Sequence, residues 1–119
     1  MKYLKAITVC LFVLFGIFAC ANPKASRSSL VIAESKSYEA SLYRQNCAVC
    51  HGAEAYGKEL DGKFVPSLRF GDIEKKSEQE IYEQIAHGKL PMPSFKNQLT
   101  EEEIQKMVIF IRRDLQGKN

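Results

Sequence analysis

The run Cys47-Ala48-Val49-Cys50-His51 decides how the rest of this 119-residue chain is interpreted. It places two thiols three positions apart and an imidazole directly after the second thiol. This C-x-x-C-H spacing is typical of covalent haem attachment. Two thiols so spaced reach both vinyl groups on one edge of a porphyrin, and the adjacent imidazole offers a nitrogen lone pair to the iron. The run therefore predicts one covalently bound haem c, attached through Cys47 and Cys50 and ligated by His51.

Two other interpretations of the same run stay open at this point. A zinc site normally needs four protein ligands, and beyond the motif the candidate domain offers only His87 and the distant Cys20. A thioredoxin-like dithiol would require strands that alternate with helices, and we find no such pattern around Cys47. Haem attachment is therefore favoured over a dithiol or structural disulfide, and over zinc.

The segments around the motif predict short helices. Ser77-Glu78-Gln79-Glu80 and Thr100-Glu101-Glu102-Glu103 are capping boxes followed by apolar residues at helical spacing. Recurrent glycine and proline predict a long loop between Gly52 and Asp72, and no segment shows convincing strand alternation. We therefore expect an all-α fold, a small bundle of short helices and long loops wrapped around one haem that supplies missing apolar surface.

Met92 and His87 are the candidates for the second axial position. Pro91 and Pro93 bracket Met92 in a stretch that cannot be helical, which stiffens the backbone and holds the thioether in one direction. Met107 falls on the apolar face of the last predicted helix, where packing is the expected role. His87 is expected to face solvent near a helix C-terminus. Met92 is the preferred ligand, with His87 as its rival.

On these residues the chain resembles the class I (mono-haem) cytochromes c over residues 37–116. Four features occur in the family's order. They are a helix over 38–47 with Tyr43 four residues before the first cysteine, the loop Val65-Pro66-Ser67-Leu68, the loop from Gly88 to Phe95 around Met92, and a C-terminal helix that ends in the pair Phe110-Ile111. The resemblance implies that the Pro66 carbonyl accepts a hydrogen bond from the proximal imidazole. It also implies that Leu68 belongs to the cofactor site and that Met92 is the sixth ligand.

The family pattern raises two further expectations about packing. A glycine often stands eight residues before the first cysteine in this family, whereas Glu39 stands there in this chain, so Ala40 is expected to take over the small-residue role where the first and last helices cross. Six aromatic residues are expected in the core or against the haem: Tyr43, Phe64, Phe70, Tyr82, Phe95 and Phe110.

An iron with both axial positions filled leaves no place for a substrate, which predicts an electron-transfer protein rather than an enzyme. The soft thioether favours ferrous iron and raises the reduction potential. Lys58, Lys63, Lys89 and Lys96 are expected near the haem edge, where they could dock redox partner proteins. The alternative is a haem-binding subunit or enzyme, a peroxidase or gas-binding sensor, in which Met92 is displaced.

The N-terminal residues predict export. Lys2 and Lys5 precede an apolar run from Ala6 to Ala21, which is shorter than the roughly 20 residues of a spanning helix and suits a signal-peptide core. Cys20 at its end fits lipoprotein processing, although ordinary cleavage would remove it, and an uncleaved anchor is a further alternative. The expected organisation is a cleaved signal peptide over 1–19, a flexible tether over 20–36 that starts at a lipidated Cys20, and a cytochrome c domain over 37–119.

The charge of the chain excludes one class of partner. The formal net charge is +3, and removal of the signal peptide takes away two lysines and no acid, which leaves 15 basic and 14 acidic residues, or +1. A nearly neutral chain lacks the concentrated basic face that nucleic acids require. The expected location is the periplasmic or extracytoplasmic face of a membrane, held there by lipid, with a soluble periplasmic form as the alternative.

Overall fold

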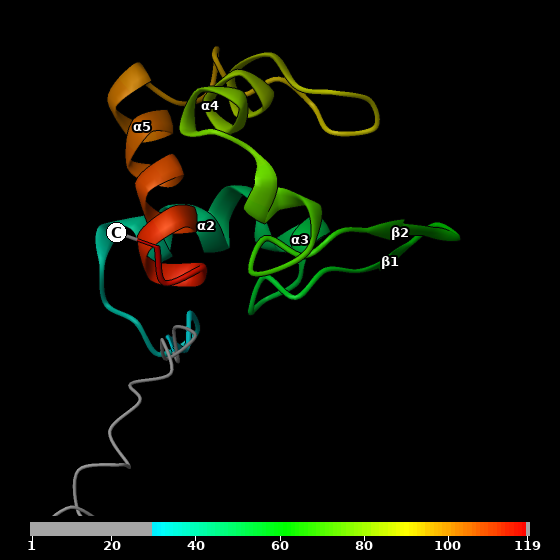
Figure 1. Ribbon diagram of the computed structural model, residues 1–119, viewed down its shortest axis with the longest axis horizontal. Coiled ribbons are helices and arrows are strands. Elements are labelled where there is room, and N and C mark those ends of the chain that lie inside the picture. The colour runs from blue at the N-terminus through cyan, green and yellow to red at the C-terminus, as the bar shows by residue number, and fades with distance from the viewer. Residues whose placement is uncertain (1–29, 119) are drawn as a thin grey trace, which may run out of the picture.

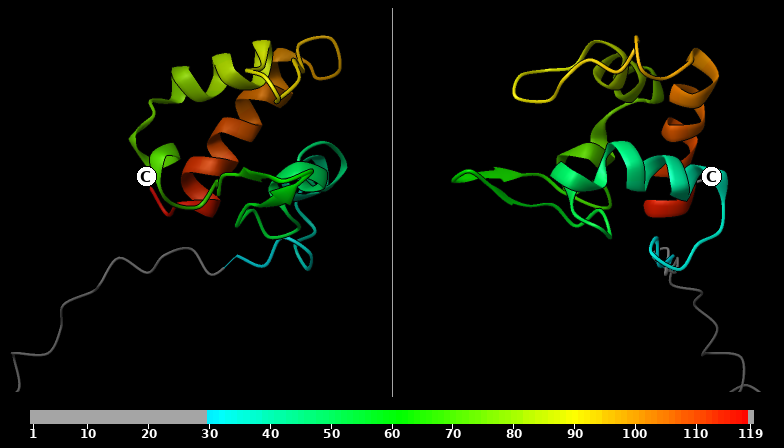
Figure 2. Two further views of the ribbon diagram at one scale, coloured as in Figure 1. Left: turned by 90° about the vertical axis from the view of Figure 1, so that its right-hand side faces the viewer. Right: turned by 180° about the vertical axis from the view of Figure 1, so that it is seen from behind.

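The computed structural model describes residues 30–118, and its short helices confirm the expected all-α class (Figure 1). The helices are α2 (Tyr38–Asn46), α3 (Ala48–His51), α4 (Glu78–His87) and α5 (Glu101–Ile109), with a 3-10 helix η2 (Asp72–Lys75) and a π-helical turn η3 (Phe110–Leu115) that continues α5. α5 packs against both α2 and α4. Figure 2 shows the loop after α4 and the segment after α3 on the same side of these helices.

Both predicted capping boxes are present and start their helices. The Ser77 hydroxyl accepts a hydrogen bond from the Glu80 backbone N–H, and the Glu80 carboxylate accepts one from the Ser77 N–H. Thr100 and Glu103 make the same reciprocal pair at the start of α5. Each pair satisfies backbone donors that have no partner inside the helix. The starts of α4 and α5 are thereby confirmed.

The core lies where α2 and α5 cross. Tyr43 of α2 and Phe110 at the end of α5 are buried, with ring centroids 6.1 Å apart. Met107 is also buried in this core, which is the packing role expected of it. Ala40 on α2 is fully buried in the core, and its small-residue role at the crossing of the two helices stays a prediction.

A short hairpin that the sequence did not predict lies within residues 52–72, a stretch expected to be mostly loop. Strand β1 (Lys58–Leu60) pairs antiparallel with β2 (Lys63–Val65), and the hairpin projects from the body of the domain (Figure 1). Asp61 and Gly62 join the strands with φ values of 50° and 73°. Asp-Gly is a strong signal for such a two-residue turn, whose twist matches that of the strands. Strands of three residues are too short for alternation to be visible in the sequence.

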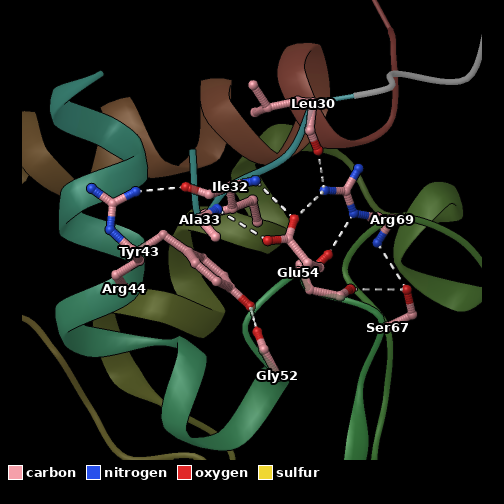
Figure 3. Close-up of polar contacts among 10 residues, drawn as sticks. Leu30, Ile32, Ala33, Tyr43, Arg44, Gly52, Glu54, Ser67 and Arg69 are labelled. Carbon is pink, nitrogen blue, oxygen red and sulfur yellow. Dashed lines mark hydrogen bonds and ion pairs between the residues drawn. The ribbon is translucent and has the colours of Figure 1, made fainter. Parts of the chain in front are cut away.

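Residues 30–36, expected to belong to a flexible tether, pack against the domain (Figure 3). Ile32 is fully buried in the core. Its backbone N–H and that of Ala33 donate to the Glu54 carboxylate at 2.7 and 3.0 Å. The Arg44 guanidinium donates to the Ile32 carbonyl oxygen at 2.6 Å.

Arg69 holds the same segment from the other side. Its guanidinium donates to the Leu30 carbonyl oxygen at 2.7 Å and to the Glu54 carbonyl oxygen at 2.6 Å (Figure 3). The packed unit therefore reaches back to Leu30 rather than beginning at Ser37. The physical reason is that burial of the apolar Ile32 side chain removes its surface from water and lowers the free energy of the folded chain. The nearby charged groups form hydrogen bonds with the backbone polar atoms around it.

Replacement of Ile32 by alanine is expected to lower the free energy of unfolding of the holoprotein by about 2 to 5 kcal/mol, because it leaves a cavity at a fully buried position. Chemical denaturation measures this change. The matched control is Val31→Ala, at a neighbouring exposed side chain, for which the expected change stays within about 0.5 kcal/mol. Equal denaturation midpoints for the two variants would show that this segment lies outside the cooperative unit.

The predicted signal peptide over 1–19 and the lipidation site Cys20 lie outside the described residues and stay predictions. Among residues 30–118, no helix is both long enough and apolar enough to cross a membrane.

Candidate haem site

Cys47 lies at the junction between α2 and α3, and the single turn α3 carries Cys50 and His51. Both cysteines are free thiols and half-buried. Burial, with a smaller contribution from the nearby Cys50, raises the pKa of Cys47 to about 12. Reactive dithiols have depressed thiol pKa values, so the surroundings of Cys47 are unlike those of a redox-active pair.

The zinc alternative requires several His, Cys, Asp or Glu side chains to gather around one metal ion. Within the described part of the chain, no group of three or more His, Cys, Asp or Glu side chains is placed to hold a metal ion.

The His51 imidazole contacts the loop that follows the hairpin. Its Nδ1 lies 3.2 Å from the Pro66 carbonyl oxygen. Because a carbonyl oxygen only accepts hydrogen bonds, this contact requires the proton on Nδ1 and leaves the Nε2 lone pair free. Burial lowers the pKa of His51, against a smaller raising effect of the Pro66 hydrogen bond. The neutral imidazole, which is the form that binds metals, is therefore favoured.

Backbone hydrogen bonds hold this loop against the motif. The Gly57 N–H donates to the His51 carbonyl oxygen at 2.9 Å, and the Leu68 N–H donates to the Ala55 carbonyl oxygen at 3.0 Å. The Tyr43 hydroxyl donates to the Gly52 carbonyl oxygen at 2.7 Å (Figure 3). Leu68 itself is buried in the core. The carbonyl that faces His51 thus belongs to a braced segment.

Sequence reasoning missed the side chains that complete this brace. The Ser67 hydroxyl donates to the Ala55 carbonyl oxygen at 3.1 Å and accepts from the Arg69 N–H at 3.0 Å. Arg69 is buried and lies 3.6 Å from the Glu54 carboxylate. Arginine and glutamate are mostly surface residues, so nothing in the sequence distinguished this pair from solvated charges.

The loop around Met92 is tied to α4. Lys89 and Met92 exchange backbone hydrogen bonds of 3.1 and 2.9 Å. Gly88 has φ 72°, and a Cβ at that position would lie 2.6 Å from the Met92 carbonyl oxygen, so only glycine permits the chain to fold back here. The Ser94 hydroxyl then donates to the Ala86 carbonyl oxygen at 2.6 Å. Met92 is half-buried and packs against the core.

The rival ligand His87 lies on the surface. It is the last residue of α4 and is exposed, as expected, with its Nε2 3.1 Å from the Glu83 carboxylate.

Several large apolar side chains are exposed along the segments that carry the candidate ligands. Phe64 on the hairpin is 73% exposed and Leu90 in the Met92 loop is 95% exposed. Phe70 is exposed too, whereas Tyr43, Phe95 and Phe110 are buried and Tyr82 is half-buried. A position in or against the core is therefore confirmed for the last four, while packing of Phe64 and Phe70 against the haem stays a prediction. Large apolar groups at the surface commonly mark a site that another group covers.

These features fit a porphyrin attached to the chain. Two free thiols can form thioether bonds, one imidazole presents a free Nε2, and exposed apolar side chains lie on the segments around them. The fold and the site together define a small helical protein of the covalent haem class.

Comparisons with known proteins identify the family within that class. Residues 39–111 match the family described as "Cytochrome C oxidase, cbb3-type, subunit III". The chain therefore belongs to the cytochrome c family and carries covalently bound haem c, for which Cys47, Cys50 and His51 form the attachment motif.

Individual relatives agree with this assignment. The chain is 37% identical over 73 residues to "Cytochrome bc1 complex cytochrome c subunit" of Corynebacterium efficiens, which covers 60% of this chain but only 23% of that protein's length. It is 33% identical over 106 residues to cytochrome c6 of Nostoc sp., with 83% of this chain and 86% of the relative covered. The solved structure of KustC0563 c-type cytochrome is 34% identical, with a TM-score of 0.51, and the match covers 60% of this chain and 90% of that one.

Proposed function

We propose that this protein is a single-electron carrier in which His51 and Met92 would hold the iron of a bound haem c. A bound haem c supplies an iron that cycles between the ferrous and ferric states. With His51 and Met92 both holding the iron, no position would be left for a substrate, so the proposed role is electron transfer without catalysis.

The contact of 3.2 Å between His51 Nδ1 and the Pro66 carbonyl oxygen carries this proposal. It favours the tautomer in which Nε2 is free to bind iron, fixes the plane of the ring, and makes the imidazole a stronger donor. The braced loop behind Pro66 keeps the carbonyl in place. A fixed ligand geometry suits a carrier, because little rearrangement accompanies each change of oxidation state.

Support for Met92 comes from its loop. The paired hydrogen bonds with Lys89 and the close approach of Gly88 hold the Met92 backbone in one conformation. A thioether is a soft ligand that favours ferrous iron and raises the potential. Exposed His87 is engaged with Glu83 and is the weaker candidate.

The proposed partners are redox proteins, and one relative is named as a subunit of a cytochrome bc1 complex. Lys58, Lys63, Lys89 and Lys96 are exposed on the hairpin and around the Met92 loop. Exposed positive charges there can steer acidic partner surfaces toward the haem. The predicted export signal and Cys20 anchor would place this carrier at the extracytoplasmic face of a membrane.

Absorption spectroscopy of the purified holoprotein tests the proposed function. We expect reversible one-electron reduction, the weak red absorption band of ferric iron with a thioether ligand, and no binding of carbon monoxide by the reduced protein. Carbon monoxide binding together with rapid peroxide turnover by the unaltered protein would contradict the carrier role and favour a haem enzyme or gas-binding protein with an open iron.

A further inference from the structure

Residues 30–36 form a strap that closes over a pair of opposite charges (Figure 3). The Glu54 carboxylate accepts two backbone N–H groups of the strap at 2.7 and 3.0 Å, and the Arg69 guanidinium donates to the Leu30 carbonyl oxygen at 2.7 Å. The Arg69 side chain is 5% exposed and the Glu54 side chain 30% exposed. The strap therefore binds both members of the pair and helps to keep them away from water.

The same pair is bonded to the loop that faces His51. Arg69 Nε donates to the Glu54 carbonyl oxygen at 2.6 Å, and the Arg69 backbone N–H donates to the Ser67 hydroxyl at 3.0 Å (Figure 3). Ser67 directly follows Pro66, whose carbonyl oxygen lies 3.2 Å from His51 Nδ1. A continuous set of contacts therefore joins the strap to the His51 imidazole.

We propose that the strap positions His51 through Glu54 and Arg69, and that docking of the strap lowers the reduction potential. The inference rests on the proposed role of His51 as an iron ligand. While the strap is docked, the charged pair is held and the Pro66 carbonyl stays within hydrogen-bond distance of Nδ1. That hydrogen bond makes the imidazole a stronger electron donor and so favours ferric iron. When the strap leaves, water reaches the pair and its hydrogen bonds loosen, so the imidazole becomes a weaker donor and the potential rises.

The coupling acts in both directions, because two linked equilibria shift each other by the same factor. If docking of the strap favours the ferric protein, the ferric protein holds the strap more tightly than the ferrous protein does. In the sequence the strap connects the domain to the part of the chain that contains the predicted lipidation site Cys20. Tension on an anchored chain would therefore raise the potential.

Two substitutions in the holoprotein loosen the strap while they change the charge in opposite directions. Glu54→Gln removes a negative charge and leaves one side-chain oxygen, instead of two, to accept the two strap N–H groups. Arg44→Met removes a positive charge together with the hydrogen bonds from Arg44 to the Ile32 and Ser35 carbonyl oxygens, at 2.6 and 3.0 Å. The matched control is Glu34→Gln, which removes a negative charge from an exposed side chain of the strap itself.

Spectroelectrochemical titration measures the reduction potential of each variant. Glu54→Gln and Arg44→Met should both raise the equilibrium constant for reduction two- to fivefold, or about 20 to 40 mV at 59 mV per tenfold change. A purely electrostatic effect would move the two potentials in opposite directions, because loss of a negative charge disfavours ferric iron and loss of a positive charge favours it. Glu34→Gln should leave the potential unchanged.

Hydrogen exchange of the unaltered holoprotein gives a second measurement that needs no substitution. The amides of Ile32 and Ala33 are bonded to Glu54 while the strap is docked, so their exchange reports its local opening. Their opening constants should be two- to fivefold larger in the ferrous protein than in the ferric protein. A difference of the same size and direction at the amide of Met107, a buried residue of α5, would mean that the whole fold opens and would contradict a local strap.

The outcomes separate this inference from the proposed function. If the potentials of Glu54→Gln and Arg44→Met move in opposite directions or stay unchanged, the positioning role of the strap is overturned while the carrier role stands. Equal opening constants of the strap amides in the two oxidation states overturn it as well. If the unaltered protein shows no reversible one-electron reduction, the proposed function itself fails and the inference falls with it.

Discussion

Alanine at both Cys47 and Cys50 is expected to abolish covalent attachment of haem. Each thioether bond needs one of these sulfur atoms, and Cys47 and Cys50 are the only free cysteines among the described residues. Mass spectrometry after denaturation checks the result: the unaltered protein should retain the mass of one haem, and the double variant should retain none. Protein of both kinds must be made in cells that have haem-maturation machinery.

The chain offers a matched control inside the same motif. Val49 is exposed between the two cysteines, and Val49→Ala should leave both thioether bonds intact. Each single cysteine variant should keep one bond and retain haem less completely. Denatured unaltered protein without haem would contradict the assignment of the cofactor.

Loss of haem should also weaken the fold. A domain of this size has a marginal balance between apolar burial and chain entropy, and exposed apolar residues such as Phe64 and Leu90 lie on the segments around the site. We expect the double cysteine variant to lose much of its cooperative unfolding transition. A circular dichroism melt as steep as that of the holoprotein would show that the helices do not depend on haem.

Replacement of Met92 by alanine is expected to lower the reduction potential by a substantial part of the roughly 0.8 V range that axial ligands span. The substitution removes the soft sulfur that favours ferrous iron and leaves the position to water, His87 or an added ligand. The red ferric band should disappear, carbon monoxide should bind the reduced protein, and peroxidase-like activity should rise. Spectroelectrochemical titration and carbon monoxide difference spectra measure these changes.

Two controls distinguish the possible ligands. Met107→Leu changes a buried methionine of the core and should leave the potential and the red band unchanged. His87→Ala should also leave them unchanged, because His87 is exposed beside Glu83. If His87→Ala alters the ferric spectrum and Met92→Ala does not, the ligand assignment is wrong while electron transfer remains possible.

Much of the helical framework was predictable because its signals are local. The pairs Ser77 with Glu80 and Thr100 with Glu103 lie within four residues of each other, and each marks a helix start that the structure contains. The hairpin is equally local in origin, since Asp61-Gly62 carries its turn, but the sequence interpretation took the glycines and the proline here only as loop signals.

Other features depend on residues far apart in the chain. The packing of residues 30–36 requires Glu54 and Arg69 to reach Ile32 and Leu30, across separations of 22 and 39 residues. These contacts leave neither a repeating pattern nor a short motif in the sequence.

The sequence by itself determined the chemistry of this protein: Cys47, Cys50 and His51 specify covalent haem because their spacing along one turn matches one edge of the porphyrin. The tertiary structure alone decided which groups hold that chemistry in place. The proton on His51 Nδ1 follows from the position of the Pro66 carbonyl, and the start of the packed unit follows from the Glu54 and Arg69 pair. The physical reason is the distance along the chain over which each signal acts. The spacing of motif residues and the helix caps involve only a few neighbouring residues, whereas hydrogen bonds between distant segments form only after folding has brought those segments together.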